Sequence, residues 1–228
     1  MPAALTSSPV GEGRSSARTL AGLLEQLGDI PLRRVRIQPP LGTATEQDLI
    51  NADPHEDGLC ELVDGVLVEK AMGLRESLLA AALLALLRGF VDPPNLGLVT
   101  GAGGTFGLFP GLVRIPDVAF ISWARIPGGR VPAEPIPQIA PDLAVEVLSE
   151  GNTPKEMERK RREYFAAGVR LVWMIDPEHR TVTIFTGPDQ STTLDTTQTL
   201  EGGDVLPGFH VALTTLFAEL DRQGPQGT

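Results

Sequence analysis

The chain has 228 residues, of which 42% are hydrophobic and 21% charged, and its 29 acidic and 19 basic side chains give a net charge of −10. This composition is typical of a soluble globular protein and excludes a wholly disordered acidic chain, and the length suits one large domain. The acidic balance argues against non-specific adhesion to nucleic acid, although an enzyme that binds phosphate at one local basic site remains compatible with it.

The cysteine content and the apolar segments bear on the compartment. Cys60 is the single cysteine, so the chain has no internal disulfide, as is usual in a reducing cytoplasm. The most apolar segment, residues 78–87, is about half the ~20 residues that a helix needs to cross a bilayer. No N-terminal stretch has the basic and then apolar pattern of a secretory signal. We therefore expect a cytoplasmic protein without a membrane span.

The chain divides by composition into three parts. Residues 1–42 begin with a Pro/Ser/Gly-rich arm and predict a peripheral, partly flexible extension, with a short helix near residues 17–27. The main domain is expected over residues 43–222. Residues 223–228 are polar and predict a disordered tail.

The first elements of the main domain have clear local signals. Thr45 and Asp48 have the spacing of a capping box, which predicts a short helix up to residue 52. Asp64 and Gly65 separate two apolar runs and predict a two-residue hairpin turn, because both residue types tolerate positive φ. Residues 74–91 are rich in Leu and Ala on nearly every face, which predicts a helix buried against a sheet and suited to contact with a partner chain.

The rest of the domain alternates strands with one strong helix signal. Thr153 as N-cap, Pro154 in the first turn and Glu156 in a capping box predict a helix that ends at Gly168. The proline-studded loop at residues 127–141 suggests a lid or a substrate-facing segment. A closing strand or turn and a terminal helix over residues 213–220 are expected last. The predicted strands are residues 96–99, 105–109, 113–121, 143–148, 170–175 and 181–186.

Two acidic residues interrupt runs that otherwise read as buried strands. Asp117 and Glu146 are each flanked by apolar residues, and an unpaired carboxylate in a sheet interior loses several kcal/mol of solvation. Such groups are usually retained only when a cation, a proton or a strong hydrogen-bond network compensates them, and Mg²⁺ or Mn²⁺ prefers oxygen ligands. The pair therefore predicts a metal site that leaves room for water and a substrate phosphate. Glu61, at the start of the first hairpin strand, is a third acidic candidate.

The helix after Thr153 offers basic side chains that could orient a water or stabilise negative charge on a phosphate. Lys160 and Arg161 both flank the inward face that Met157 and Tyr164 define, so spacing alone does not choose between them. The alternative interpretation of this run is a solvated basic helix face.

An ordered series of motifs resembles a known family. The motifs are residues 61–65 (ELVDG), 115–119 (IPDVA), 141–149 (PDLAVEVLS), Lys160 followed by Tyr164 and Gly168, and residues 172–177 (VWMIDP). Together they resemble the Uma-type restriction endonucleases of the PD-(D/E)XK nuclease superfamily. The resemblance covers roughly residues 45–217 and implies an α/β fold, a restriction-endonuclease-like mixed central β-sheet flanked by helices.

The resemblance also assigns roles to the candidate residues. It implies Asp117 and Glu146 as metal ligands and Glu61 as an additional acidic member of the site. The parent superfamily places its lysine two residues after the second acid, where this chain has Leu148. In the Uma-type branch the following helix supplies the lysine, which selects Lys160 over Arg161.

The resulting hypothesis is a Mg²⁺- or Mn²⁺-dependent endonuclease that hydrolyses DNA by a metal-activated water, with the main-chain carbonyl of Val147 completing the coordination. A homodimer is expected, and no organic cofactor. Two alternatives stay open. One is a nuclease fold that no longer cleaves and serves as a binding or assembly module, and the other is a metal-dependent hydrolase of a small phosphorylated substrate.

Overall fold

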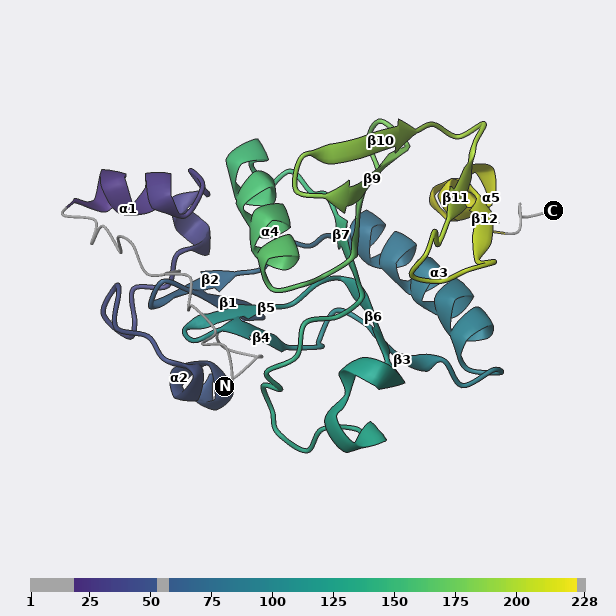
Figure 1. The fold of residues 1–228 in the computed structure, drawn as a ribbon. Helices are drawn as coiled ribbons and strands as arrows, with labels where there is room; N and C mark the ends of the chain where they lie inside the picture. Colours follow the sequence, from purple (N-terminus) through teal and green to yellow (C-terminus); the bar gives the residue numbers. More distant parts are fainter. Residues whose placement is uncertain (1–18, 53–57, 225–228) are drawn as a thin grey trace.

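The computed structural model describes residues 19–52 and 58–224 (Figure 1). The N-terminal arm at residues 1–18 and residues 225–228 of the predicted tail lie outside the described residues. The chain forms a mixed α/β fold in which two β-sheets meet below helix α4 (Figure 1).

The larger sheet has six strands in the order β10-β9-β8-β7-β6-β3. Strands β7 and β8 pair in parallel, with Val145 opposite Trp173, and all other neighbours are antiparallel, so this is a mixed sheet. Its strands are β3 (Gly97–Thr100), β6 (Val118–Ser122), β7 (Leu143–Val147), β8 (Leu171–Asp176), β9 (Thr181–Gly187) and β10 (Gln190–Leu194). The predicted fold class is confirmed, since helices cover both faces of this sheet.

The smaller sheet has the order β2-β1-β5-β4 and is antiparallel throughout. Its strands are β1 (Cys60–Val63), β2 (Val66–Glu69), β4 (Phe106–Phe109) and β5 (Leu112–Arg114). As predicted, Asp64 and Gly65 form the turn between β1 and β2, with φ of 49° and 73°. A Cβ on Gly65 would lie 2.4 Å from the Gly42 carbonyl oxygen, so this turn requires glycine for space as well as for φ.

Helix α3 (Leu74–Val91) covers one face of the six-stranded sheet, and its bounds agree with the prediction. One face of the helix is buried, and its side chains form a core with the sheet and with α5 (Leu213–Phe217). The helix contributes Leu79, Leu83, Leu87 and Val91 to this core, among others. Strand β12 (His210–Ala212) pairs with β11 (Thr199–Glu201), and the terminal turn η4 (Ala218–Asp221) contacts α3.

Helix α4 (Pro154–Ala166) lies on the opposite face of the same sheet. Its predicted N-cap is confirmed, because the Thr153 hydroxyl accepts a hydrogen bond from the Glu156 N–H and the Glu156 side chain completes a capping box. The capping box predicted at Thr45 is also present and begins α2 (Glu46–Asn51). Met157 and Tyr164 point from α4 into the second core, which also receives residues of both sheets.

The described part of the N-terminal segment packs into this second core. It contains α1 (Leu20–Gln26) and the turn η1 (Leu32–Arg34), and Leu27, Ile30 and Val35 are buried beside α4 and β2. No helix within the described ranges has both the length and the apolar character that crossing a bilayer requires.

One predicted strand is wrong in a way that shapes the site. Residues 113–121 do not form a single strand, because β5 ends at Arg114 in the smaller sheet and β6 begins at Val118 in the larger one. Pro116 has no N–H to donate to a ladder, so the strand breaks there. The chain crosses from one sheet to the other at this break and places Asp117 at the junction.

The C-terminal part contains two strands that the sequence did not predict, β10 and β11. In β10 four of the five residues are exposed, and its centre is Ser191, Thr192 and Thr193. It therefore lacks the alternation of apolar and polar residues that identifies a half-buried strand. The loop at residues 127–141 has no strand and only one short helical turn, η3 (Pro127–Gly129), next to η2 (Trp123–Arg125).

Candidate active site

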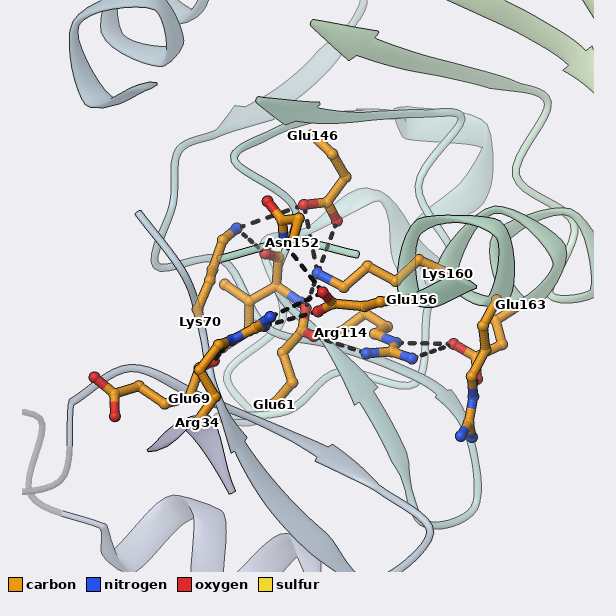
Figure 2. Close-up of polar contacts among 12 residues, drawn as sticks. Arg34, Glu61, Glu69, Lys70, Arg114, Glu146, Asn152, Glu156, Lys160 and Glu163 are labelled. Carbon is orange, nitrogen blue, oxygen red and sulfur yellow. Dashed lines mark hydrogen bonds and ion pairs between the residues drawn. The ribbon is translucent and has the colours of Figure 1, made fainter. Parts of the chain in front are cut away.

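Five charged side chains converge where the two sheets meet helix α4 (Figure 2). Glu61 comes from β1, Lys70 follows β2, Asp117 precedes β6, Glu146 lies in β7 and Lys160 lies in α4. The strand alternation directs Glu146 to the α4 side, since its neighbours Val145 and Val147 face the core beneath α3. The structure thus brings together all four candidate side chains and adds Lys70, which the sequence analysis missed.

Asp117 and Glu146 share one ammonium group. Lys70 Nζ lies 2.8 Å from Asp117 Oδ1 and 4.0 Å from Glu146 Oε2, and it also donates a hydrogen bond to the Ile115 carbonyl. Asp117 Oδ2 accepts a 2.7 Å hydrogen bond from the Val147 N–H. Its Oδ1 accepts no hydrogen bond of good geometry from any residue in the described ranges. The ion pair with Lys70 is therefore the main compensation for that oxygen.

Lys160 lies between two carboxylates. Its Nζ is 3.1 Å from Glu61 Oε1 and 3.5 Å from each oxygen of Glu146, and its side chain is only 1% exposed. Tyr164, one turn further along α4, donates a 2.6 Å hydrogen bond to Glu146 Oε1. The spacing of four residues thus places both groups over Glu146.

Glu61 is completely buried, and both of its oxygens are engaged. Oε1 accepts a 3.1 Å hydrogen bond from the Ile115 N–H, in addition to its contact with Lys160. Oε2 accepts a 2.7 Å hydrogen bond from Arg114, whose guanidinium also pairs with Glu163 of α4. Glu61 therefore joins β1 to β5, to the segment that follows β5 and to α4 through three separate groups.

The pKa values of the two buried glutamates, Glu61 and Glu146, shift in opposite directions. Burial favours the neutral form of Glu61, but the positive charges of Lys160, Arg114 and Lys70 outweigh it and hold its pKa well below the ordinary value. At Glu146, burial dominates and raises the pKa, since Lys160 and Lys70 compensate it only in part and Asp117 adds repulsion. Burial also opposes the charge on Lys160, but Glu146 and Glu61 raise its pKa above the ordinary value. The amine is therefore a positively charged ammonium group.

A second buried ion pair, between Arg34 and Glu156, lies next to the site at the start of α4. Arg34, from the N-terminal segment, makes two hydrogen bonds of 2.7 and 2.8 Å to Glu156 of α4. The same guanidinium donates to the carbonyls of Glu69 and Gly151, each at 2.7 Å. It thereby fixes the residue before Lys70 relative to the start of α4 (Figure 2).

Arg161, the alternative basic residue, lies elsewhere. Its guanidinium stacks on the Phe185 ring at 4.7 Å from the ring centre and lies 3.8 Å from Asp189. The acids of the site are thus contacted by Lys160 and not by Arg161. For Lys70 the sequence carried a weak signal, a lysine directly after an apolar strand. Arg114 also stands next to the Ile-Pro-Asp motif.

Comparison with known proteins identifies the family. Residues 47–215 match the model of the Uma2 family, whose description is "Putative restriction endonuclease". No curated protein matches the chain significantly. A crystal structure described as a putative nuclease belonging to DUF820, from Anabaena variabilis, superposes with a TM-score of 0.66 at 21% identity. It covers 77% of this chain and 98% of its own, which shows a shared fold. Since the family match extends over most of the chain, this protein belongs to the Uma2 restriction-endonuclease family.

Proposed function

We propose that the protein is a Mg²⁺- or Mn²⁺-dependent endonuclease that hydrolyses phosphodiester bonds of DNA. The observation that carries this proposal is the convergence of Asp117 and Glu146 on a single ammonium group, at 2.8 and 4.0 Å. Two carboxylates that both contact one ammonium group lie in the same small volume, where a divalent ion would find both as ligands. Membership in a restriction-endonuclease family supports the same reaction class.

The donor atoms suit a hard cation. Asp117 Oδ1 and Glu146 Oε2 are carboxylate oxygens of the type that Mg²⁺ prefers, and the Val147 carbonyl is a third oxygen ligand in this proposal. No group of three or more His, Cys, Asp or Glu side chains is placed to hold an ion within the described ranges. Waters and a substrate phosphate would therefore complete the coordination. When bound, the ion would lower the pKa of a water and neutralise charge on the phosphate.

The remaining residues have separate roles in this proposal. Lys160 supplies a positive charge next to Glu146, where it would orient the attacking water or stabilise negative charge on the phosphate. Both oxygens of Glu61 are engaged, so we assign Glu61 to the positioning of Lys160 and not to direct metal binding. Tyr164 fixes the orientation of Glu146 through its hydroxyl.

The surface of α3 and the composition support a homodimer and a cytoplasmic location. The face of α3 opposite the core is apolar, with Leu74 78% and Leu78 40% exposed, which supports a homodimer that buries these residues. A cytoplasmic location agrees with the single Cys60, which is buried and forms no disulfide.

The test is DNA cleavage in the presence and absence of Mg²⁺ and Mn²⁺. Asp117→Asn and Glu146→Gln should each reduce cleavage at least about 100-fold, because each removes a proposed ligand charge with little change in shape. Lys160→Met should reduce it by roughly the same factor. Arg161→Met is the matched control on the same helix, and Glu150→Gln is a control at an exposed acid. Both controls should cleave like the unmodified protein.

A non-cleaving binding module is the rival function, and the position of Lys70 favours it, since an ammonium already compensates the acid pair. The rival predicts that the unmodified protein cuts neither plasmid nor single-stranded DNA with any divalent ion. It also predicts that Asp117→Asn retains the binding partner. Turnover of a generic small phosphodiester without cleavage of DNA would instead identify a small-molecule hydrolase.

A further inference from the structure

Lys70 occupies the place of a cation in the proposed metal site. Its Nζ is the positive group that contacts both Asp117 Oδ1 and Glu146 Oε2, and its side chain is 3% exposed. A divalent ion held by Asp117 and Glu146 would be ligated by the same two oxygens that the ammonium group contacts. The ion and the ammonium group would therefore compete for the same pair of oxygens.

The partners of each base in the site lead to the same conclusion. Three buried acids (Glu61, Asp117 and Glu146) face three buried bases (Lys70, Lys160 and Arg114), and Arg114 also pairs with Glu163. Lys160 and Arg114 also contact Glu61, which is not a metal ligand in this proposal, so both keep this partner when an ion binds. Among the described residues, the Lys70 ammonium group has hydrogen bonds or ion pairs with only the two proposed ligands and the Ile115 carbonyl. It is therefore the base whose partners a divalent ion would take.

The local structure allows Lys70 to move. It follows the last residue of β2, and residues 70–73 form neither helix nor strand before α3 begins. Met72 and Gly73 are exposed. A lysine side chain has four rotatable bonds and can change its rotamer without a change in either sheet.

We propose that Lys70 is an exchangeable counter-cation that neutralises the acid pair until a divalent ion displaces it, and that it thereby sets the metal affinity of the site. This inference rests on the proposed function, because it takes Asp117 and Glu146 as the metal ligands. Without its own cation, the pair of buried carboxylates would repel each other. With Lys70 in place, an ion must displace the ammonium group, and this makes the net free energy of metal binding less favourable.

The test measures Mn²⁺ binding without DNA by titration calorimetry, or by the electron paramagnetic resonance signal of free Mn²⁺. Lys70→Met should bind Mn²⁺ about 10-fold or more tightly than the unmodified protein, because no ammonium competes. Lys70→Arg keeps a positive charge and should not gain affinity. Lys155→Gln is the control, since this lysine is 62% exposed and pairs with Asp29 on the surface. It should leave the affinity unchanged.

Thermal unfolding gives a second readout for the case that Lys70→Met folds poorly. The variant should melt at a lower temperature without metal, and Mn²⁺ should raise its melting temperature by more than that of the unmodified protein. Unchanged or weaker Mn²⁺ affinity in Lys70→Met would overturn the inference. Lys70 would then lie beside the ion or support it.

This design separates the inference from the proposed function. If the unmodified protein binds Mn²⁺, Asp117→Asn abolishes binding and Lys70→Met has no effect, then the metal site stands and the role of Lys70 falls. If only Lys70→Met binds Mn²⁺, the inference is supported and the natural site is blocked by its own lysine, as the rival non-cleaving function requires. If neither protein binds Mn²⁺, both proposals fail.

Discussion

At the scale of single residues, the site is a network in which each buried charge has a specific partner. An isolated ammonium or carboxylate is costly in a protein interior, and removing one member of a buried pair leaves the other uncompensated. Lys160 is a clear case, because it is almost fully buried yet contacts both Glu61 and Glu146. Substitutions in this network should therefore affect stability as well as activity, and the two effects need separate measurements.

Tyr164→Phe isolates one hydrogen bond of this network. It removes only the hydroxyl that donates to Glu146 Oε1 at 2.6 Å and keeps the buried ring. We expect the free energy of unfolding to fall by about 1–3 kcal/mol, the usual range for a hydrogen bond to a charged group. Urea unfolding followed by circular dichroism measures this change. A variant as stable as the unmodified protein would show that the Tyr164 hydroxyl contributes no net stability.

Glu156→Gln tests the second buried ion pair through its pH dependence. Burial favours the neutral carboxyl of Glu156, but hydrogen bonds and charge from Arg34, and the charge of Lys160, lower its pKa below the ordinary value. An unfolded chain therefore binds a proton at this residue more readily than the folded protein. The stabilisation is present above the unfolded pKa of about 4.5 and is lost as the pH falls through the lower, folded pKa.

The variant should accordingly lose stability at neutral pH, by roughly 3 kcal/mol, because Arg34 is left without its counter-charge. Below about pH 4.5 the difference from the unmodified protein should shrink, since protonated Glu156 is also neutral there. Urea unfolding at several pH values between 3 and 7 measures both effects. A constant difference over this range would mean that folding does not change the pKa of Glu156.

At the scale of elements, local signals predicted most helices and hairpins, whereas long-range placement was not predictable. The capping boxes at Thr45 and Thr153 and the Asp64-Gly65 turn depend on neighbouring residues only, and each is present. The break of the predicted strand at residues 113–121 depends on which sheet receives each half. Strand β10 is polar and owes its conformation to pairing with β9, which its own residues do not indicate.

The same distinction applies to the site. Asp117 and Glu146 stood out because a charge within an apolar run is unusual in any sequence. Lys70 and Arg114 stand at strand ends, where charged residues are common, so only the fold shows that they are buried. Arg34 lies in a segment predicted to be peripheral, and its pairing with Glu156 joins residues that are 122 positions apart.

The start of α4 offers a test at this scale, because the helix carries Lys160 and Tyr164. The Thr153 hydroxyl accepts from the Glu156 N–H at 3.1 Å and donates to the Gly28 carbonyl. Thr153→Ala removes both interactions and should lower the free energy of unfolding by about 1–2 kcal/mol. Thr153→Ser keeps the hydroxyl and should lose much less. Equal losses in thermal or urea unfolding would indicate that the methyl group, and not the cap, stabilises the helix.

At the scale of the whole molecule, the two faces of the six-stranded sheet have different tasks. One face, with α4 and the smaller sheet, holds the charged site, and the other packs under α3 and α5 (Figure 1). The outer side of α3 nevertheless remains apolar, with Leu74, Leu78, Ala81 and Ala85 exposed at helical spacing. A helix whose two opposite faces are both apolar suits burial between a core and a second chain.

Leu78→Glu tests whether a second copy of the protein covers this face. In a monomer the side chain is 40% exposed, and the substitution should change stability little. In a homodimer it places a carboxylate in an apolar interface, which should weaken association by roughly 100-fold or more. Light scattering coupled to size-exclusion chromatography should then show a dimer for the unmodified protein and a monomer for the variant. Val131→Glu, at a residue 67% exposed on the loop far from α3 in sequence, is the control and should remain dimeric. A monomeric unmodified protein at micromolar concentration would contradict the proposed dimer and leave the apolar face of α3 open to a different partner.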